Sequence, residues 1–199
     1  MRHRATGQVS AICAVVLLAC VVSAVSVSRS HAAPGALRSQ PDTEGLQQFQ
    51  AALQKYITLR KGISNEIPPL QVTDKAEQIV QTSDAAARAI ERARGEAPQG
   101  EFFTPAVAKV LRARMRTVAA RVDVSDVITP DGDEKATPGR IRVNGRFPQG
   151  SPLPTMPPSL LEVLPVVPKG LEYRLLGTTL ILRDIEAAII LDYLPDAFR

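Results

Sequence analysis

The sequence predicts an α+β protein with an N-terminal three-helix bundle, a Pro-rich connector and a small C-terminal antiparallel β-meander. Three observations predict this order. Apolar residues recur at helical spacing between about residues 44 and 122. Seven prolines fall within residues 148–170, and a segment with this proline density holds no long helix. From residue 171 onward, short aliphatic runs alternate with turn residues, which is typical of short strands.

Residues 1–32 are predicted to be an export signal peptide. Arg2 and Arg4 precede an uncharged run that extends from position 5 to position 28. A short positive segment followed by an apolar run and small residues is the pattern of a secretory signal. We therefore expect an exported bacterial protein, either periplasmic or secreted.

Three outcomes of processing stay open, and cleavage is the favoured one. Small residues precede the bonds after Ala24 and after Ala32, so either bond suits a signal peptidase. The run LLAC at residues 17–20 resembles a lipobox, in which Cys20 would be lipidated. The uncharged run is also long enough to cross about 30 Å of hydrocarbon as an uncleaved N-terminal membrane anchor.

Export changes the meaning of the net charge. The whole chain has a formal net charge of +4. Arg2, Arg4 and Arg29 lie in the predicted signal peptide, and no acidic residue does, so the mature chain is close to neutral. Because a nucleic-acid-binding domain carries a strong positive charge, no nucleic-acid partner is expected.

Cleavage after Ala32 would remove every cysteine and histidine, namely Cys13, Cys20, His3 and His31. The mature chain would then have no thiol nucleophile, no histidine-based catalytic triad and no zinc site built from histidine or cysteine. No cofactor is expected.

The helical part, residues 44–122, follows a linker. Residues 33–43 are rich in Pro, Gly and polar residues, which predicts a flexible segment. The first helix is expected over 44–61, ahead of Gly62. The second is expected over 74–94, with Thr73 as an N-cap candidate.

The third helix has the clearest start. Thr104 is a favoured N-cap residue, and Pro105 takes the first helical position. One face of this helix is apolar and contains Val107, Leu111, Met115, Val118 and Val122. Ahead of the cap, Phe102 and Phe103 are expected to pack onto the bundle.

Residues 123–170 are predicted to be a Pro/Gly-rich connector. The run IRVNGRF at 141–147 alternates like a short strand, and SLLEVL at 159–164 is expected to form a short helix. The rest of the connector is expected to lie extended over the surface.

The C-terminal part, residues 171–199, is apolar but does not span a membrane. Its longest uncharged run is 175–182, far shorter than the roughly 20 residues that a span needs. Two strands joined at Gly177 and Thr178 are expected. Residues 185–194 are expected to be either a third strand or a helix, and this choice stays open.

The third helix also carries the most one-sided charge of the chain. Lys109, Arg112 and Arg116 fall opposite its apolar face, with Arg114 and Arg121 beside it. These cations suit an anionic envelope component or an acidic protein. The favoured interpretation, however, is that they pair with acidic neighbours such as Glu77, Asp84 and Glu91.

Two groups of carboxylates are weaker candidates. Asp131, Asp133 and Glu134 surround a glycine turn and suggest a calcium site, but the spacing of an EF-hand loop is absent and a solvated turn is favoured. The carboxylates near the C-terminus, Asp184, Glu186 and Asp192, would suit a two-carboxylate hydrolase. For these, capping and turn roles are favoured.

The C-terminal run resembles a family of uncharacterised exported bacterial proteins. The pattern is PPxLLxxLP, then LEYRxxGxxLxLRD, then IxD, and this chain carries it between Pro157 and Asp192. The resemblance implies a secreted or periplasmic protein of unknown function. More loosely, the YRxxG hairpin is similar to the C-terminal module of a periplasmic nickel/cobalt homeostasis family, but no matching metal ligands are found in this chain.

These observations together favour a non-enzymatic binding or structural module of the cell envelope. A hydrolase that acts on envelope glycans through carboxylates is the alternative.

Overall fold

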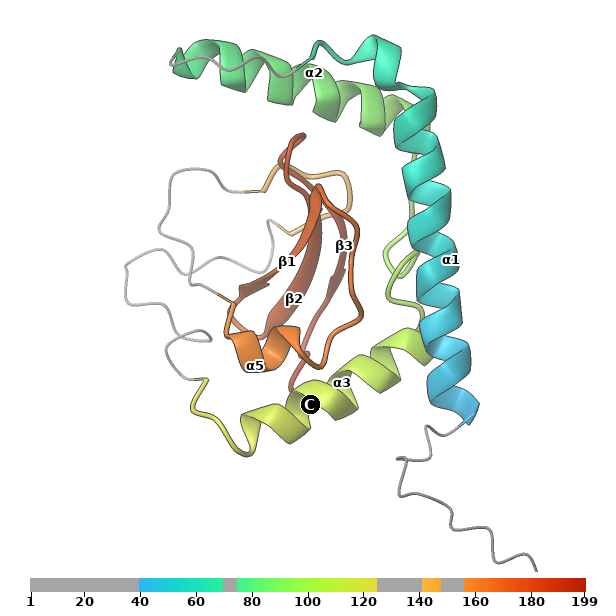
Figure 1. Cartoon of the computed structure of the whole chain (residues 1–199), viewed down its shortest axis with the longest axis vertical. Coiled ribbons are helices and arrows are strands. Elements are labelled where there is room, and N and C mark those ends of the chain that lie inside the picture. The colour runs from blue at the N-terminus through green and yellow to red at the C-terminus, as the bar shows by residue number, and fades with distance from the viewer. Residues whose placement is uncertain (1–39, 70–74, 125–140, 148–155) are drawn as a thin grey trace, which may run out of the picture. The chain divides into compact units, whose positions relative to one another are not determined.

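A computed structural model of the chain describes residues 40–69, 75–124, 141–147 and 156–199. Within these residues, three long helices precede a three-stranded antiparallel sheet (Figure 1). The elements are α1 (Gln40–Gly62), η1 (Ser64–Glu66), α2 (Ala76–Arg94), α3 (Pro105–Ala119), α5 (Pro158–Leu161), β1 (Leu171–Leu176), β2 (Thr179–Asp184) and β3 (Ile189–Leu194). The predicted α+β class is confirmed.

α1 begins earlier than the sequence predicts. It starts at Gln40, so residues 40–43 of the expected linker are helical. Asp42 lies in the first turn, where a negative charge interacts favourably with the helix dipole. The remainder of the expected linker lies outside the described residues.

The other two long helices lie close to their predicted bounds. α2 begins at Ala76, and its N-cap position is Lys75, which makes no side-chain capping bond; the expected cap Thr73 lies outside the described residues. α3 begins as predicted. Thr104 precedes Pro105, and its Oγ1 accepts a hydrogen bond of 3.4 Å from the backbone N–H of Val107.

The expectation that the three helices form a bundle of their own is not confirmed. α1 packs against α3, and Gly45 allows a close approach, since a Cβ there would lie 3.2 Å from the carbonyl oxygen of Ala106. The buried faces of all three helices, however, belong to one core that also includes the sheet. Its members include Phe49, Leu53, Ala86, Ile90, Leu111, Met115, Tyr173, Leu180, Leu182 and Leu191. The apolar faces of the helices are therefore buried against the sheet as well as against one another.

The sheet has the strand order β1-β2-β3. β1 and β2 form the predicted hairpin, in which Leu176 pairs with Thr179. Gly177 in the turn has a φ of 56°, a conformation that costs glycine little. Residues 185–188 form a turn and the following residues form β3, so the open choice is resolved in favour of a strand.

Residues 141–147 lie beside β3, with backbone hydrogen bonds to Ala188 and Ile190, but they do not form the predicted strand. Arg146 makes one isolated antiparallel bridge to Ile189. Asn144 has a φ of 60°, and this left-handed residue turns the chain just before Gly145. Phe147 nevertheless packs with Ile181 and Ile190 in a second, smaller core.

The short helix α5 confirms the expectation for residues 159–164 in part. It begins at Pro158 and ends at Leu161, and a proline at the first position suits a helix start. Leu160 is fully buried in the main core. The predicted signal peptide lies outside the described residues. No helix in the described ranges is long and apolar enough to cross a membrane.

Candidate functional site

The carboxylate of Asp184 lies at the end of β2, on the side of the sheet that faces the helices. Its side chain is 2% exposed. The hydroxyl of Tyr56 donates a hydrogen bond of 2.8 Å to Oδ2, and the backbone N–H of Ala187 donates one of 2.8 Å to Oδ1. The Nε of Arg60 lies 3.1 Å from Oδ2. Three groups from two distant parts of the chain therefore satisfy this carboxylate.

Tyr56 is held as a neutral hydrogen-bond donor. Burial raises its pKa well above the ordinary value, and the adjacent negative charge of Asp184 raises it further. A neutral phenol donates to a carboxylate without adding charge to the core. The pair therefore joins α1 to β2.

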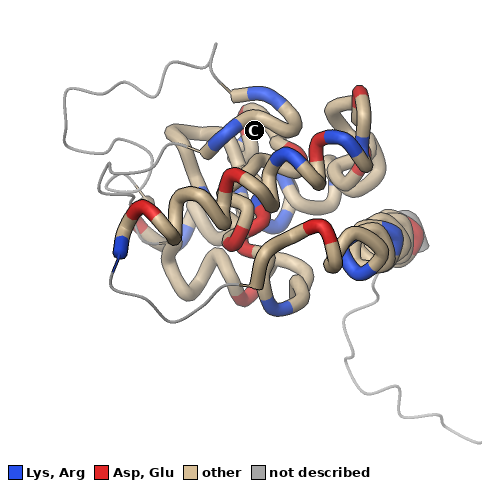
Figure 2. The backbone as a smooth tube through the Cα atoms, turned by 90° about the horizontal axis from the view of Figure 1, so that it is seen from above, with Lys and Arg blue, Asp and Glu red and all other residues tan. Residues whose placement is uncertain are grey.

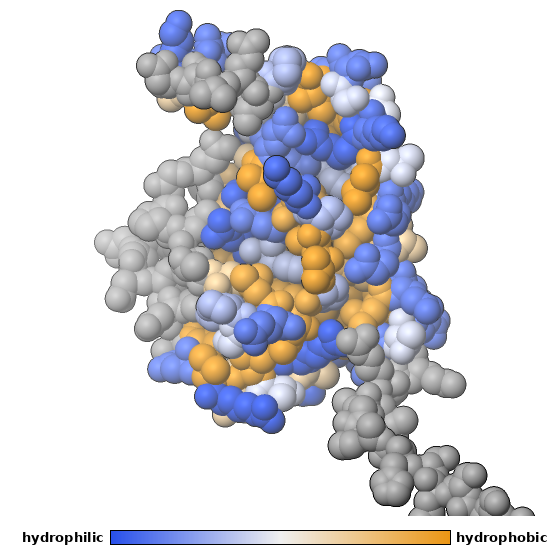
Figure 3. Space-filling model, in the orientation of Figure 1, coloured by the Kyte–Doolittle hydropathy of each residue, from blue (hydrophilic) through white to orange (hydrophobic). Residues whose placement is uncertain are grey.

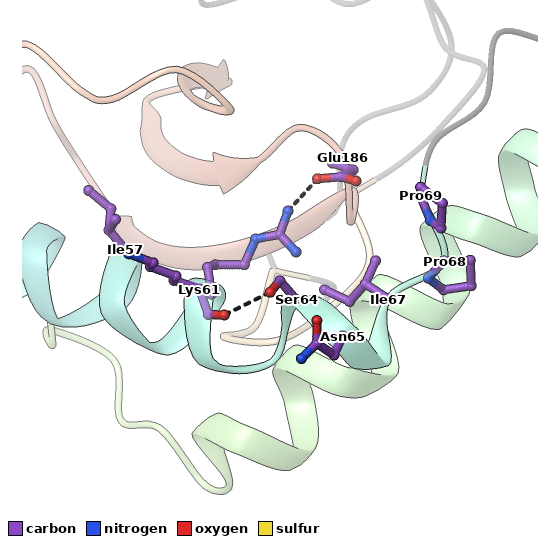
Figure 4. A pocket seen from close by; sticks show the side chains of 9 residues that line it. Ile57, Lys61, Ser64, Asn65, Ile67, Pro68, Pro69 and Glu186 are labelled. Carbon is purple, nitrogen blue, oxygen red and sulfur yellow. Dashed lines mark hydrogen bonds and ion pairs between the residues drawn. The ribbon is translucent and has the colours of Figure 1, made fainter.

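Arg60 links the same carboxylate to the surface. Besides Asp184, it donates from Nη2 to Glu186 in the turn between β2 and β3. Glu186 lines an open hollow of about 670 Å³ beside the C-terminal end of α1 (Figure 4). The ion pair thus forms one wall of this hollow.

Asp192 in β3 has a separate set of partners. Its side chain is fully buried. It accepts hydrogen bonds from the backbone N–H groups of Gly100 at 2.9 Å, Phe102 at 2.8 Å and Phe103 at 2.8 Å. These donors lie in the loop between α2 and α3, so the carboxylate holds that loop on the sheet. Phe103 stacks on Phe49 of α1, with ring centroids 6.1 Å apart.

Arg94 is a buried cation next to this loop. Its side chain is 3% exposed and pairs with Glu101 at 2.8 Å. It also donates to the side-chain oxygen of Asn144 at 2.6 Å and to the carbonyl of Leu191 at 2.9 Å. Arg94 therefore ties the end of α2 to β3 and to residues 141–147.

These contacts bear on the hydrolase interpretation. A two-carboxylate glycosidase needs one carboxyl group as acid and another as base or nucleophile, both facing the substrate. Among the described residues, Asp192 accepts hydrogen bonds only from backbone N–H groups. Asp184 and Glu186 instead share one guanidinium. The arrangement favours the capping and turn roles.

The predicted basic residues of α3 fall into two groups. Lys109 and Arg116 are exposed, and neither has a partner among the described residues. Arg112 is half-buried and donates to the carbonyl oxygens of Pro195 at 2.9 Å and Asp196 at 3.2 Å. Two donors of Arg112 are therefore engaged by the C-terminal turn, which lies over that flank of the helix, and its role in binding an anionic partner stays a prediction.

The expected acidic partners on α2 are engaged differently. Asp84 pairs with Arg146 at 2.6 Å, and Arg114 donates to the carbonyl oxygen of Val163 at 3.2 Å. No ion pair joins α3 to Glu77 or Glu91 in the described part of the chain. Figure 2 shows acidic and basic residues interspersed along α2, the helix nearest the viewer. α2 therefore carries charges of both signs, whereas the charged residues of α3 are all basic.

The surface of the described residues also includes exposed apolar side chains. Several large apolar side chains are exposed, namely Ile79, Val80, Val122, Leu161, Val166 and Ile185. On the face drawn in Figure 3, hydrophobic side chains are interrupted by hydrophilic ones. The calcium candidates Asp131, Asp133 and Glu134 lie outside the described residues. Within the described residues, no group of three or more histidine, cysteine or acidic side chains is placed to hold a metal ion.

The sequence patterns did not single out Tyr56, Arg60 or Arg94 as partners of the buried carboxylates. Tyr56 recurs at helical spacing with Phe49 and Leu53, which predicts only that it lies on an apolar helix face. The apolar sequence around Asp184 and Asp192 does predict that hydrogen-bond donors surround them, because a buried carboxylate requires such donors. The sequence alone does not say which donors these are.

The chain was compared with protein-family models, curated proteins and solved structures, and none of them matched. The resemblance of residues 157–192 to exported proteins therefore stays a prediction.

Proposed function

We propose that this is an exported cell-envelope protein whose folded part is a non-enzymatic binding module. Its contact surface is the exposed side of α3, which presents Lys109 and Arg116 to an anionic envelope component. The proposal is supported mainly by one observation: these two cations are exposed and have no partner among the described residues, whereas the buried carboxylates that a hydrolase would use are engaged in holding helices on the sheet.

The geometry of α3 supports a contact with a negatively charged surface. Lys109 and Arg116 are seven residues apart, two turns along one side of a helix, or about 10 Å. Ala113, which lies between them, and Thr117, which follows Arg116, are both exposed. No acidic residue lies between Pro105 and Val122. The small flanking side chains let both charges approach the same plane.

The strength expected of such a contact is modest. Each cation near an anionic surface contributes about 1 kcal/mol, and salt screens this attraction. Reversing both charges should therefore weaken binding at least about tenfold. Export to the envelope, as the N-terminal segment predicts, would bring the module to such surfaces.

The test is co-sedimentation of the protein with lipid vesicles. Vesicles of phosphatidylcholine alone are compared with vesicles that also contain phosphatidylglycerol. We expect salt-sensitive binding only to the second kind, reduced by Arg116→Glu and reduced further by Lys109→Glu in addition. Arg88→Glu is the matched control. It changes the net charge by the same amount as Arg116→Glu, but Arg88 is exposed on α2 among acidic neighbours.

Two results would count against the proposal. One is equal loss of binding in Arg116→Glu and Arg88→Glu, since this would mean that only net charge matters. The other is absence of binding to the anionic vesicles at low salt. Circular dichroism of each variant controls for folding.

A further inference from the structure

The hollow at the C-terminal end of α1 combines an apolar lining with separated charges. Ile57, Ile67, Pro68 and Pro69 provide the apolar part, and Arg60, Lys61 and Glu186 provide the charges. The hollow has a volume of about 670 Å³ and is open to solvent. It is separate from the exposed face of α3.

The walls of the hollow are set by the fold before any ligand arrives. α1 ends at Gly62, η1 turns the chain, and Pro68 and Pro69 fix their own φ angles. The hydroxyl of Ser64 donates a hydrogen bond of 2.8 Å to the carbonyl oxygen of Lys61, which holds this turn against the helix (Figure 4). A preformed site loses little free energy in ordering itself on binding.

The charges around the hollow are not all neutralised locally. Arg60 is shared by two carboxylates, those of Asp184 and Glu186, so this group of three carries one excess negative charge. Glu186 is its outer member, with a side chain 35% exposed. Lys61 is exposed, and its ammonium has no partner among the described residues. The rim therefore presents one excess negative charge and one excess positive charge.

Arg60 keeps one nitrogen of its guanidinium group available for a ligand. Its Nε and Nη2 are engaged by the two carboxylates, while Nη1 has no acceptor among the described residues. A ligand carboxylate placed at Nη1 and the Lys61 ammonium would gain charge-assisted hydrogen bonds. A ligand ammonium placed at Glu186 would offset its excess negative charge.

We propose that this hollow binds a small apolar zwitterion, of the class of a free α-amino acid with an aliphatic side chain. The carboxylate is bound by Lys61 and Arg60, the ammonium by Glu186, and the side chain lies against Ile57 and Ile67. A neutral site with separated charges disfavours multiply charged anions such as phosphates. This site is independent of the α3 surface.

The test is a titration of the full chain with L-leucine, followed by NMR of the methyl groups of Ile57 and Ile67. Three analogues each remove one feature: N-acetyl-leucine removes the ammonium, leucinamide removes the carboxylate, and glycine removes the aliphatic side chain. We expect saturable shifts with leucine and binding at least about tenfold weaker for each analogue, the loss expected for one charge-assisted hydrogen bond or a buried aliphatic side chain.

Two variants connect these preferences to the named residues. Lys61→Gln should weaken leucine but not leucinamide, and Glu186→Gln should weaken leucine but not N-acetyl-leucine. Arg88→Glu, on α2, should leave leucine binding unchanged. The proposal is overturned if millimolar leucine shifts neither isoleucine methyl group, or if leucine, leucinamide and N-acetyl-leucine bind alike. Neither outcome bears on vesicle binding by α3, so the two proposals fail separately.

Discussion

The hydroxyl of Tyr56 in α1 lies 2.8 Å from the carboxylate of Asp184 at the end of β2, although 128 residues separate them in the sequence. Both groups are buried, and the bond joins the N-terminal helical part to the C-terminal sheet. The helices and the sheet therefore share polar contacts as well as an apolar core, and we expect them to unfold together.

Replacing the Tyr56 hydroxyl should destabilise the protein. Tyr56→Phe leaves Asp184 with Arg60 and the Ala187 N–H but without its phenolic donor, which should lower the free energy of unfolding by about 1–2 kcal/mol. Urea unfolding measures this. Tyr193→Phe is the control, because the Tyr193 hydroxyl takes no part in this network. A double-mutant cycle with Asp184→Asn isolates the pair, and an interaction energy near zero would contradict this account.

The three N–H groups that face Asp192 make its substitution more costly. In Asp192→Asn, one amide oxygen replaces two carboxylate oxygens and the new NH₂ group faces backbone donors. We expect a loss of about 3 kcal/mol and faster hydrogen exchange at Phe102 and Phe103. Asp196→Asn is the matched control, since the Asp196 side chain pairs only with the exposed Arg199 in the described part of the chain. Unchanged exchange at both phenylalanines would show that Asp192 does not hold the loop.

Two arginines near the end of α2 should respond differently to the same change. Arg94→Lys removes the planar group that reaches Glu101, Asn144 and the Leu191 carbonyl together, and we expect a loss of about 2 kcal/mol. Arg92→Lys should change stability by less than about 0.5 kcal/mol, because its pair with Glu66 is exposed. Equal effects on the melting temperature would contradict the assignment of Arg94 as a structural cation.

Glu172 on β1 should contribute a small stabilisation that depends on pH. Partial burial acts to raise its pKa, but hydrogen bonds and positive charge from Arg174 and Arg183 outweigh this and hold the pKa below its ordinary value. A carboxylate with a lowered pKa in the folded state stabilises the protein above the pKa of the unfolded chain, and this stabilisation is lost as the pH falls through the folded pKa. Glu172→Gln should therefore destabilise slightly at neutral pH and not at all in strong acid. If the stability difference between the wild-type protein and Glu172→Gln grew as the pH fell, the predicted direction of the pH dependence would be wrong.

Local signals explain which elements the sequence predicts well. Thr104 and Pro105 define the start of α3 within two neighbouring residues, and Gly177 and Thr178 define the hairpin turn in the same way. Such signals act over a few residues, so periodicity and turn chemistry are sufficient. The choice between strand and helix for 185–194 was harder, because an aliphatic run of that length suits both structures until its pairing with β2 is known.

The contacts that shape the candidate sites depend on distant parts of the chain. Helical spacing correctly placed Arg112 away from the apolar face of α3, but it could not show that the turn at Pro195 and Asp196 covers that flank. For the same reason the sequence marked Asp192 as a charge in an apolar run without showing its donors at residues 100–103. The three-helix bundle stays unconfirmed, because the apolar faces of the helices belong to one core with the sheet.

The central claim is that the chain works as an exported protein, and the intact mass of the protein from fractions of its native host tests this most directly. The account predicts a product that begins at Val25 or Ala33 in the exported fraction, or one lipidated at Cys20 in the membrane fraction. A full-length product that begins at Met1 and is found only in the cytoplasm would contradict export, and the envelope function with it.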